Sequence, residues 1–120
     1  MSRFVDRAAT DEVTLANGDR VWVRQRLTGE DQALLSRELV KMSLDAASGE
    51  VAVEEFTWYN QQVAVCRAYL VRWDFRDDEE QAVPFSPEAV NRLDDYTVAE
   101  IAQAVDRLQK TRREAFQKKA

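Results

Sequence analysis

Apolar and polar residues alternate on both sides of Ala16-Asn17-Gly18, near the start of the chain. Alternation is typical of strands with one buried face, and an Asn-Gly pair between two such runs predicts a β-hairpin over residues 12–26. A two-residue loop would pair Val13 with Trp22 and split the valines between the two faces. A three-residue loop with a left-handed Gly18 instead keeps one face apolar, formed by Val13, Leu15, Val21 and Val23. The alternation therefore predicts the three-residue loop and leaves Trp22 on the opposite face.

Farther along, apolar residues recur every three or four positions, which is typical of helices. A first helix is predicted over residues 29–44, with Thr28 and Asp31 as a capping box at its start and loop residues 45–49 after it. A second helix is predicted from one continuous stripe, Phe56, Tyr59, Val63, Cys66, Leu70 and Trp73. Because residues 51–56 and 63–71 also contain β-branched and aromatic residues, a strand over part of this segment stays an alternative.

Two further helices are predicted after an acidic turn at residues 77–80. Ser86 as N-cap with Pro87 in the first helical position predicts a short helix that ends near residue 93. Thr97 and Glu100 form a capping box that opens the last helix, which is expected to bury Val98, Ile101, Val105 and Leu108. We therefore expect a mainly α (α+β) fold, in which an N-terminal hairpin packs on about four helices.

The domain organisation follows from the same pattern. Residues 1–11 lack periodicity and are expected to form a flexible arm. Residues 12–109 form one globular domain, and residues 110–120 form a charged, solvated helical tail. A chain of 120 residues with 45% apolar and 32% charged residues has the balance of one folded domain.

Charge and composition exclude several classes of protein. The net charge is -5 and the basic residues are scattered, so nucleic acid is not an expected partner. No secretory signal and no apolar run of about 20 residues is present, so we expect a soluble, intracellular protein that does not enter a membrane. The single cysteine, Cys66, allows no internal disulfide and is consistent with a reducing compartment.

Catalytic, cofactor and metal sites are not expected. The chain has no histidine, and its three glycines stand apart, so neither the commonest general base nor a phosphate-binding loop is present. Cys66 lies on an apolar stripe and is interpreted as a buried, inert thiol. The acidic run at 77–80 lacks the spacing of a calcium loop and is interpreted as a solvated turn. The sequence thus predicts that the protein is not an enzyme.

Aromatic residues point instead to protein binding, because binding surfaces are enriched in them. The candidate protein-binding residues are Trp22, Trp58, Phe75 and Phe85. Trp73 is interpreted as part of the core. The basic residues of the tail could form a patch for an acidic partner or a nucleic acid, but Glu114 interrupts them and solvation is the default interpretation.

One segment combines these features in a familiar order. Residues 70–75 read Leu-Val-Arg-Trp-Asp-Phe, an acidic turn follows, and residues 83–90 read Val-Pro-Phe-Ser-Pro-Glu-Ala-Val before a leucine-bearing last helix. This order resembles the tail assembly chaperones of long-tailed (siphovirus-type) bacteriophages over residues 69–108, and the rest of the chain only in outline. The residues that carry the resemblance are Trp73, Asp74, Pro84, Ser86 and Pro87. The turn departs from the family, because many relatives have an Asp-Gly pair where residues 78–81 contain no glycine.

The resemblance implies a non-enzymatic assembly factor in the cytoplasm of the host bacterium, absent from the mature virion. Its partners would be the tape measure protein, which it keeps soluble, and the tail tube protein, whose polymerisation it promotes. A small acidic domain with apolar strips can cover the apolar faces of a long helical client. Many copies would be needed along such a client, so self-association into a homo-oligomer is a further hypothesis. The family often makes a longer form by frameshifting, and Lys118-Lys119 is compatible with a slippery adenine run.

Two alternatives remain open at this point. The protein could be another phage structural component, such as a head-tail connector or a minor tail protein, which would persist in the virion. It could also be a small regulatory protein that binds DNA or another protein through Trp22 or the basic tail.

Overall fold

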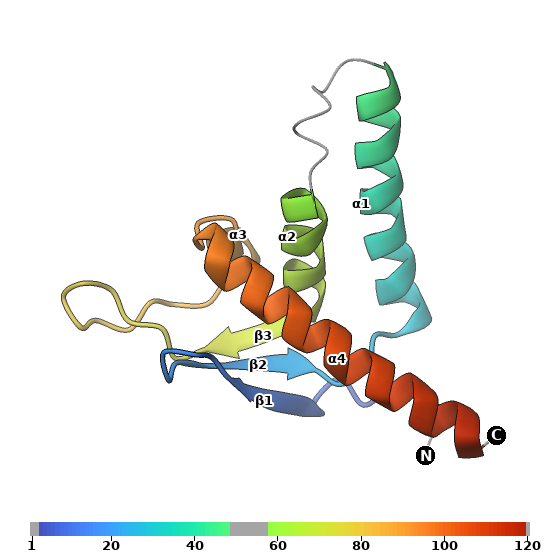
Figure 1. The fold of residues 1–120 in the computed structure, drawn as a ribbon, viewed down its shortest axis with the longest axis horizontal. Coiled ribbons are helices and arrows are strands. Elements are labelled where there is room, and N and C mark those ends of the chain that lie inside the picture. Colours follow the sequence, from blue (N-terminus) through green and yellow to red (C-terminus); the bar gives the residue numbers. More distant parts are fainter. Residues whose placement is uncertain (1–2, 49–57, 120) are drawn as a thin grey trace.

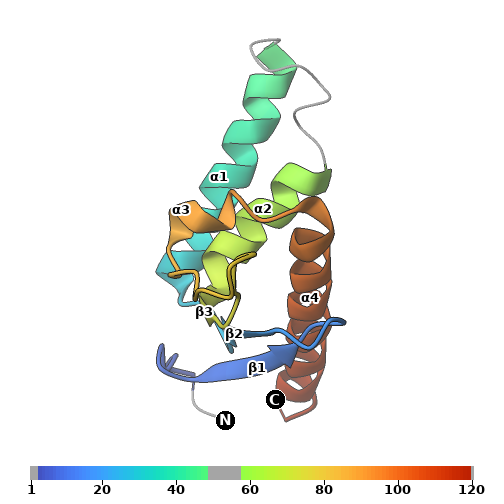
Figure 2. The same cartoon turned by 90° about the vertical axis from the view of Figure 1, so that its left-hand side faces the viewer.

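The computed structural model describes residues 3–48 and 58–119, with side chains described within 3–41 and 61–118. The elements follow in the order β1 (Thr10–Thr14), β2 (Arg20–Arg24), α1 (Gly29–Ser48), α2 (Trp58–Tyr69), β3 (Leu70–Trp73), α3 (Pro87–Val90) and α4 (Asp95–Lys119). The strands form one antiparallel sheet in the order β1-β2-β3. Figures 1 and 2 show α4 lying across one face of this sheet, with α1 and α2 side by side. The mainly helical α+β fold with an N-terminal hairpin is confirmed.

The register of the hairpin is the one that the alternation predicts. Val13 pairs with Val21 and Glu12 with Trp22, and the amide of Leu15 donates to the carbonyl oxygen of Asp19 at 2.7 Å. The loop thus spans residues 16–18, and Gly18 adopts a φ of 93°, which residues with a Cβ rarely do. The apolar face packs into the core, where Leu15, Val21 and Val23 are buried and Val13 is partly buried.

A third strand replaces the last turn of the predicted second helix. Leu70–Trp73 pairs with β2, so the prediction of a helix through Trp73 is wrong there. The strand alternative, stated for residues 63–71, holds for Leu70 and Val71. Trp73 lies opposite Val21 and Leu70 opposite Val23, with a register shift between them. The shift lets Leu70 and Trp73 point into the core although they are three residues apart, a spacing that an unbulged strand would place on opposite faces. The predicted residues 51–57 of this segment lie outside the described residues.

Side-chain caps begin three of the helices. The amide of Asp31 donates to Oγ1 of Thr28 at 3.0 Å, and the amide of Thr28 to Oδ2 of Asp31 at 3.4 Å, which confirms the capping box of α1. Helix α1 extends to Ser48, beyond the predicted end at 44. Oγ of Ser86 accepts from the amide of Ala89 at 3.0 Å with Pro87 in the first turn, as predicted, but α3 ends at Val90.

The cap of α4 differs from the prediction. Asp94 accepts from both the amide and the hydroxyl of Thr97 at 2.8 Å, so Asp94 is the capping residue and the predicted Thr97–Glu100 box is wrong. Glu100 bonds to the hairpin instead. The buried face of α4 is confirmed, since Val98, Ile101 and Val105 are buried and Leu108 packs against the core.

The C-terminal half of α4 continues as a single helix to Lys119 and contacts the start of the chain. Nη2 of Arg112 lies 2.6 Å from Oδ2 of Asp11, and the guanidinium of Arg3 stacks 5.1 Å from the centre of the Phe116 ring. Within residues 3–48 and 58–119, no helix has the length and apolar character needed to cross a membrane.

Candidate binding groove

A groove of about 560 Å³ opens where three separate parts of the chain meet. These parts are the hairpin tip, the loop between β3 and α3, and the turn from α3 into α4. The lining residues are Leu15, Ala16, Asn17, Asp19, Trp73, Phe75, Arg76, Val83, Ala89, Arg92, Leu93, Asp94, Tyr96, Thr97 and Glu100. Figure 1 shows these segments converging at the end of the molecule opposite the C-terminus.

The floor of the groove is apolar and is built around Trp73. The Trp73 side chain is buried, and its indole N–H donates to the carbonyl oxygen of Val83 at 2.8 Å. The Phe75 ring lies 5.1 Å from the Trp73 ring in a tilted contact, and the Phe85 ring packs edge-on at 4.9 Å. Because the indole N–H is satisfied internally, the floor offers apolar surface rather than a free donor.

The hairpin tip forms one wall and is joined to α4 by a hydrogen bond. Oε2 of Glu100 accepts a hydrogen bond from the amide of Ala16 at 2.7 Å. This amide belongs to the loop, where no strand partner is available, so a carboxylate from α4 satisfies it. The contact fixes the distance between two walls of the groove.

A second polar contact ties the loop after β3 to β2. Oδ1 of Asp74 accepts from the amide of Arg20 at 2.7 Å, and Oδ2 accepts from Nε of Arg20 at 2.9 Å. The amide of Arg20 and then its guanidinium lower the pKa of the Asp74 carboxyl below its usual value. Asp74 therefore stays ionised and anchors the chain just where it leaves the sheet toward Phe75.

The rim carries charges of both signs, but they differ in availability. Asp94 is engaged by Thr97, whose amide lowers the pKa of the Asp94 carboxyl, and Glu100 is engaged by Ala16. On the other side, Arg76 donates to the carbonyl oxygen of Glu80 at 2.9 Å. No hydrogen bond or ion pair joins the Arg92 side chain to the described residues, which leaves this cation available to an incoming group.

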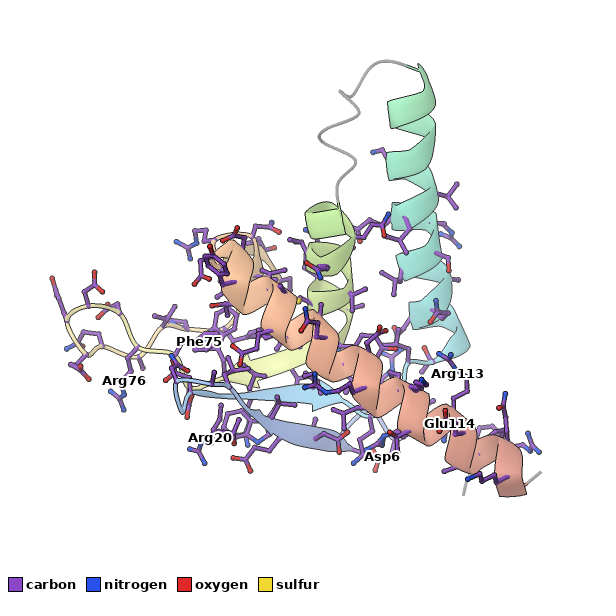
Figure 3. All side chains as sticks on the ribbon, in the orientation of Figure 1. Asp6, Arg20, Phe75, Arg76, Arg113 and Glu114 are labelled. Carbon is purple, nitrogen blue, oxygen red and sulfur yellow. The ribbon has the colours of Figure 1, made fainter. Side chains whose placement is uncertain are left out.

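Tyr96 adds an exposed aromatic ring at the lip of the groove. The residue is 84% exposed although it lies beside the apolar floor, an arrangement that is unusual for a tyrosine without a partner. Figure 3 places Phe75 and Arg76 where the loop leaves the sheet, so the aromatic floor and a cationic rim residue lie next to each other.

The candidate residues of the sequence analysis fall in different places. Phe75 lines the groove, and Phe85 supports it from beneath through Trp73. Trp22 lies on the other face of the sheet, half-buried, with the guanidinium of Arg72 at 4.1 Å and that of Arg20 at 5.2 Å from its ring. The side chain of Trp58 lies outside the described side chains. The structure thus brings Phe75 and Phe85 together and separates both from Trp22.

Most of the residues that carry the resemblance shape the groove, and Trp73 also lines it. Trp73 forms the floor, Asp74 anchors the loop, and Ser86 with Pro87 starts α3, whose end supplies Ala89 to the lining. Pro84 is exposed in the loop between them. Leu15, Arg92, Leu93 and Tyr96 could not be identified as lining residues from the sequence, because they come from two separate segments, the hairpin tip and the turn from α3 into α4, and share no periodicity.

The single cysteine of the chain, Cys66, lies outside the groove. Cys66 is fully buried, and burial raises the pKa of its thiol to about 12. Its sulfur donates to the carbonyl oxygen of Val98 at 3.6 Å, which agrees with the inert thiol inferred from the sequence. Over the described residues, no three His, Cys, Asp or Glu side chains are placed to hold a metal ion.

No protein-family model, curated protein or solved structure matches the chain.

Proposed function

We propose that this protein is a tail assembly chaperone of a long-tailed bacteriophage, and that the groove around Trp73 holds an apolar strip of its client. The client would be the tape measure protein, which the chaperone keeps soluble while tail tube subunits polymerise around it. The observation that carries the proposal is that the segment resembling the family overlaps the groove lining. The segment that resembles the family, residues 69–108, also supplies most of the groove lining.

The groove has the properties that such a client requires. Its floor combines aromatic and aliphatic side chains, which would bury the apolar face of an amphipathic helix without demanding particular hydrogen bonds. Its walls are tied by Glu100 and Asp74, so little ordering is needed on binding. A site of this kind binds many apolar sequences weakly, which suits a client that presents repeated apolar strips.

Charge places a second constraint on the client. Arg92 is the rim cation without a partner among the described residues, and Tyr96 stands beside it at the lip. A client strip with a carboxylate next to its apolar residues would pair with Arg92 while its apolar side chains cover Tyr96. The net charge of -5 keeps loaded complexes apart.

Co-expression with the tape measure protein of the same phage tests the proposal. We expect the wild-type chain to raise the fraction of the client in the soluble supernatant. Tyr96→Ala and Leu93→Asp should both reduce this fraction, the first by removing exposed contact area and the second by placing a carboxylate on the floor. A client whose solubility is the same with and without the wild-type chain contradicts the proposal.

A matched control separates groove binding from a general loss of apolar surface. Phe4 is 88% exposed and lies outside the groove lining, so Phe4→Ala removes a ring of similar exposure elsewhere. This variant should keep the solubility of the client at the wild-type value. If Phe4→Ala and Tyr96→Ala act alike, the groove is not the binding site.

Mass spectrometry of purified particles separates an assembly factor from a structural component. A chaperone leaves before the virion is complete, so its peptides should be absent from particles whose tail tube protein is readily detected. A stoichiometric amount of this chain in the particles would instead identify a connector or a minor tail protein.

A further inference from the structure

The acidic turn at residues 77–80 stands at the edge of the groove. The chain lines the groove at Arg76, leaves it through the turn and returns to line it at Val83. Backbone contacts hold the two arms of this excursion together, because Arg76 pairs with Ala82 in an antiparallel bridge and the amide of Val83 donates to the carbonyl oxygen of Phe75 at 3.0 Å. Figure 1 shows the turn projecting beyond the sheet. The turn is therefore a fixed extension of the groove wall.

The side chains of the turn carry a negative charge that is only partly offset. Asp77 accepts hydrogen bonds from two nearby backbone amides, which are neutral donors. The side chains of Asp78, Glu79 and Glu80 are exposed, and no salt bridge joins them to the described residues. Arg76 lies at the base of the turn, where it donates to the carbonyl oxygen of Glu80. Four carboxylates beside one guanidinium leave the turn negative.

The charged lining of the groove has the same overall sign. The carboxylates of Asp19, Asp94 and Glu100 line it, together with the guanidiniums of Arg76 and Arg92. Each of the three carboxylates accepts a hydrogen bond from a neutral group, so these contacts do not remove its charge. A cleft lined mainly by one sign of charge attracts groups of the opposite sign. The groove with its turn is therefore complementary to an apolar segment that also carries basic side chains.

We propose that the groove and the acidic turn together select a basic amphipathic helix as the client strip, an inference that rests on the function proposed above. Apolar side chains three and four residues apart cover the floor around Trp73, and lysine or arginine side chains beside them reach the carboxylates of the turn. One carboxylate on the strip still pairs with Arg92. The charge of the turn mainly raises the rate of association, whereas the apolar floor holds the bound helix.

Stopped-flow association of dansyl-labelled synthetic peptides tests the charge of the occupant. The first peptide has leucine at the apolar positions of a helix and lysine beside them, the second has glutamate in place of lysine, and the third keeps lysine but has serine in place of leucine. At low ionic strength the wild-type chain should bind the lysine peptide, bind the glutamate peptide about tenfold more slowly and leave the serine peptide unbound. Salt near 1 M, where the screening length is about 3 Å, should remove most of the difference between the first two.

Neutral variants of the turn show where the basic side chains bind. Asp78→Asn with Glu79→Gln should slow the association of the lysine peptide about tenfold and should not slow that of the glutamate peptide. The matched control, Glu30→Gln with Glu114→Gln, removes the same charge at exposed sites outside the groove, and Figure 3 labels Glu114 far from Arg76. This control should associate like the wild type. Tyr96→Ala changes no charge and should speed the dissociation of the lysine peptide, because it removes apolar contact at the lip.

The contrary outcomes separate this inference from the function on which it rests. Equal association rates for the lysine and glutamate peptides would overturn the inference and leave the chaperone function standing, because the groove would then accept apolar strips of either charge. A turn variant that matches its control, or a serine peptide that binds as fast as the lysine peptide, would overturn it as well. So would a wild-type chain that binds neither leucine peptide. A client that stays insoluble on co-expression, although the lysine peptide binds, contradicts the chaperone function instead.

Discussion

Glu80 lies in a backbone conformation that glycine would adopt with less strain. Its φ is 62°, and among the residues that the structure describes it is the one non-glycine residue with a positive φ. The left-handed region costs a residue with a Cβ about 1–2 kcal/mol. The turn is nevertheless held, because the amide of Glu80 donates to the carbonyl oxygen of Asp77 at 3.0 Å and Arg76 donates to the carbonyl oxygen of Glu80. Glu80→Gly keeps both backbone contacts and removes the strain.

The magnitude is best obtained from a matched pair of variants. Glycine raises the entropy of the unfolded chain, which costs about 0.5–1 kcal/mol of stability at any position. Glu79→Gly bears this entropic cost but relieves no backbone strain, because Glu79 has a negative φ. Both Glu79 and Glu80 are exposed. Both variants remove one negative charge from the same turn. The difference between them therefore isolates the strain, and Glu80→Gly should be more stable than Glu79→Gly by about 1–2 kcal/mol.

Urea unfolding followed by tryptophan fluorescence measures the free energy of unfolding of both variants and of the wild type. A difference of about 1 kcal/mol corresponds to about 4 °C in the melting temperature of a domain of this size, so thermal unfolding gives a second readout. Equal loss of stability in the two glycine variants would refute the reasoning, because it would show that Glu80 carries no backbone strain.

Three further predictions concern the caps and the core. Asp94→Ala should lower the free energy of unfolding by about 1 kcal/mol because it removes the cap of α4, whereas Asp95→Ala should change it little in the same urea titration. Trp73→Phe should lower the free energy of unfolding by about 2 kcal/mol, because the carbonyl of Val83 loses its donor. Trp22→Phe, on the open face of the sheet, serves as the control and should lower it less. Cys66 is buried, so it should react with a thiol reagent only as fast as the chain unfolds. Its pKa is raised in the folded state, so the stability that the protonated thiol contributes is present below pH 9 and is lost between pH 9 and about 12. Unfolding of the wild type and of Cys66→Ala at alkaline pH measures this loss.

The hairpin register could be predicted because one physical criterion decides it. Only the three-residue loop places Val13, Leu15, Val21 and Val23 on one face, and burying that face outweighs the preference for any particular turn. The buried stripe of α4 was predictable for the same reason. Where burial alone chooses between alternatives, the order of apolar residues is sufficient.

Strand β3 could not be predicted from periodicity. Leu70 and Trp73 are both buried at a spacing of three, which fits a helix as well as a bulged strand. Pairing with β2 decides between the two, because the residues that directly follow α2 pair with the edge of β2 that β1 leaves open. That pairing is a long-range contact, and local sequence carries no record of it.

The cap of α4 shows how two local signals compete. Asp94 stands three residues before Thr97, and Thr97 stands three before Glu100, so both pairs have the spacing of a cap. The choice depends on Glu100, which the hairpin recruits through the amide of Ala16. A contact between positions 84 residues apart thus decides where a helix begins.

The same register that buries the valines also builds the groove. With the loop over residues 16–18, the amide of Ala16 faces Glu100, and Arg20 lies beside Asp74. A two-residue loop would pair Arg20 with Leu15 instead of Thr14 and turn Val13 and Leu15 away from the face that carries Val21 and Val23. Leu15 would then leave the groove lining, whereas the contact of Arg20 with Asp74 would stay, because it depends on the pairing of β2 with β3. The apolar alternation of the first strands therefore determines the shape of a site whose floor comes from residues more than fifty positions away.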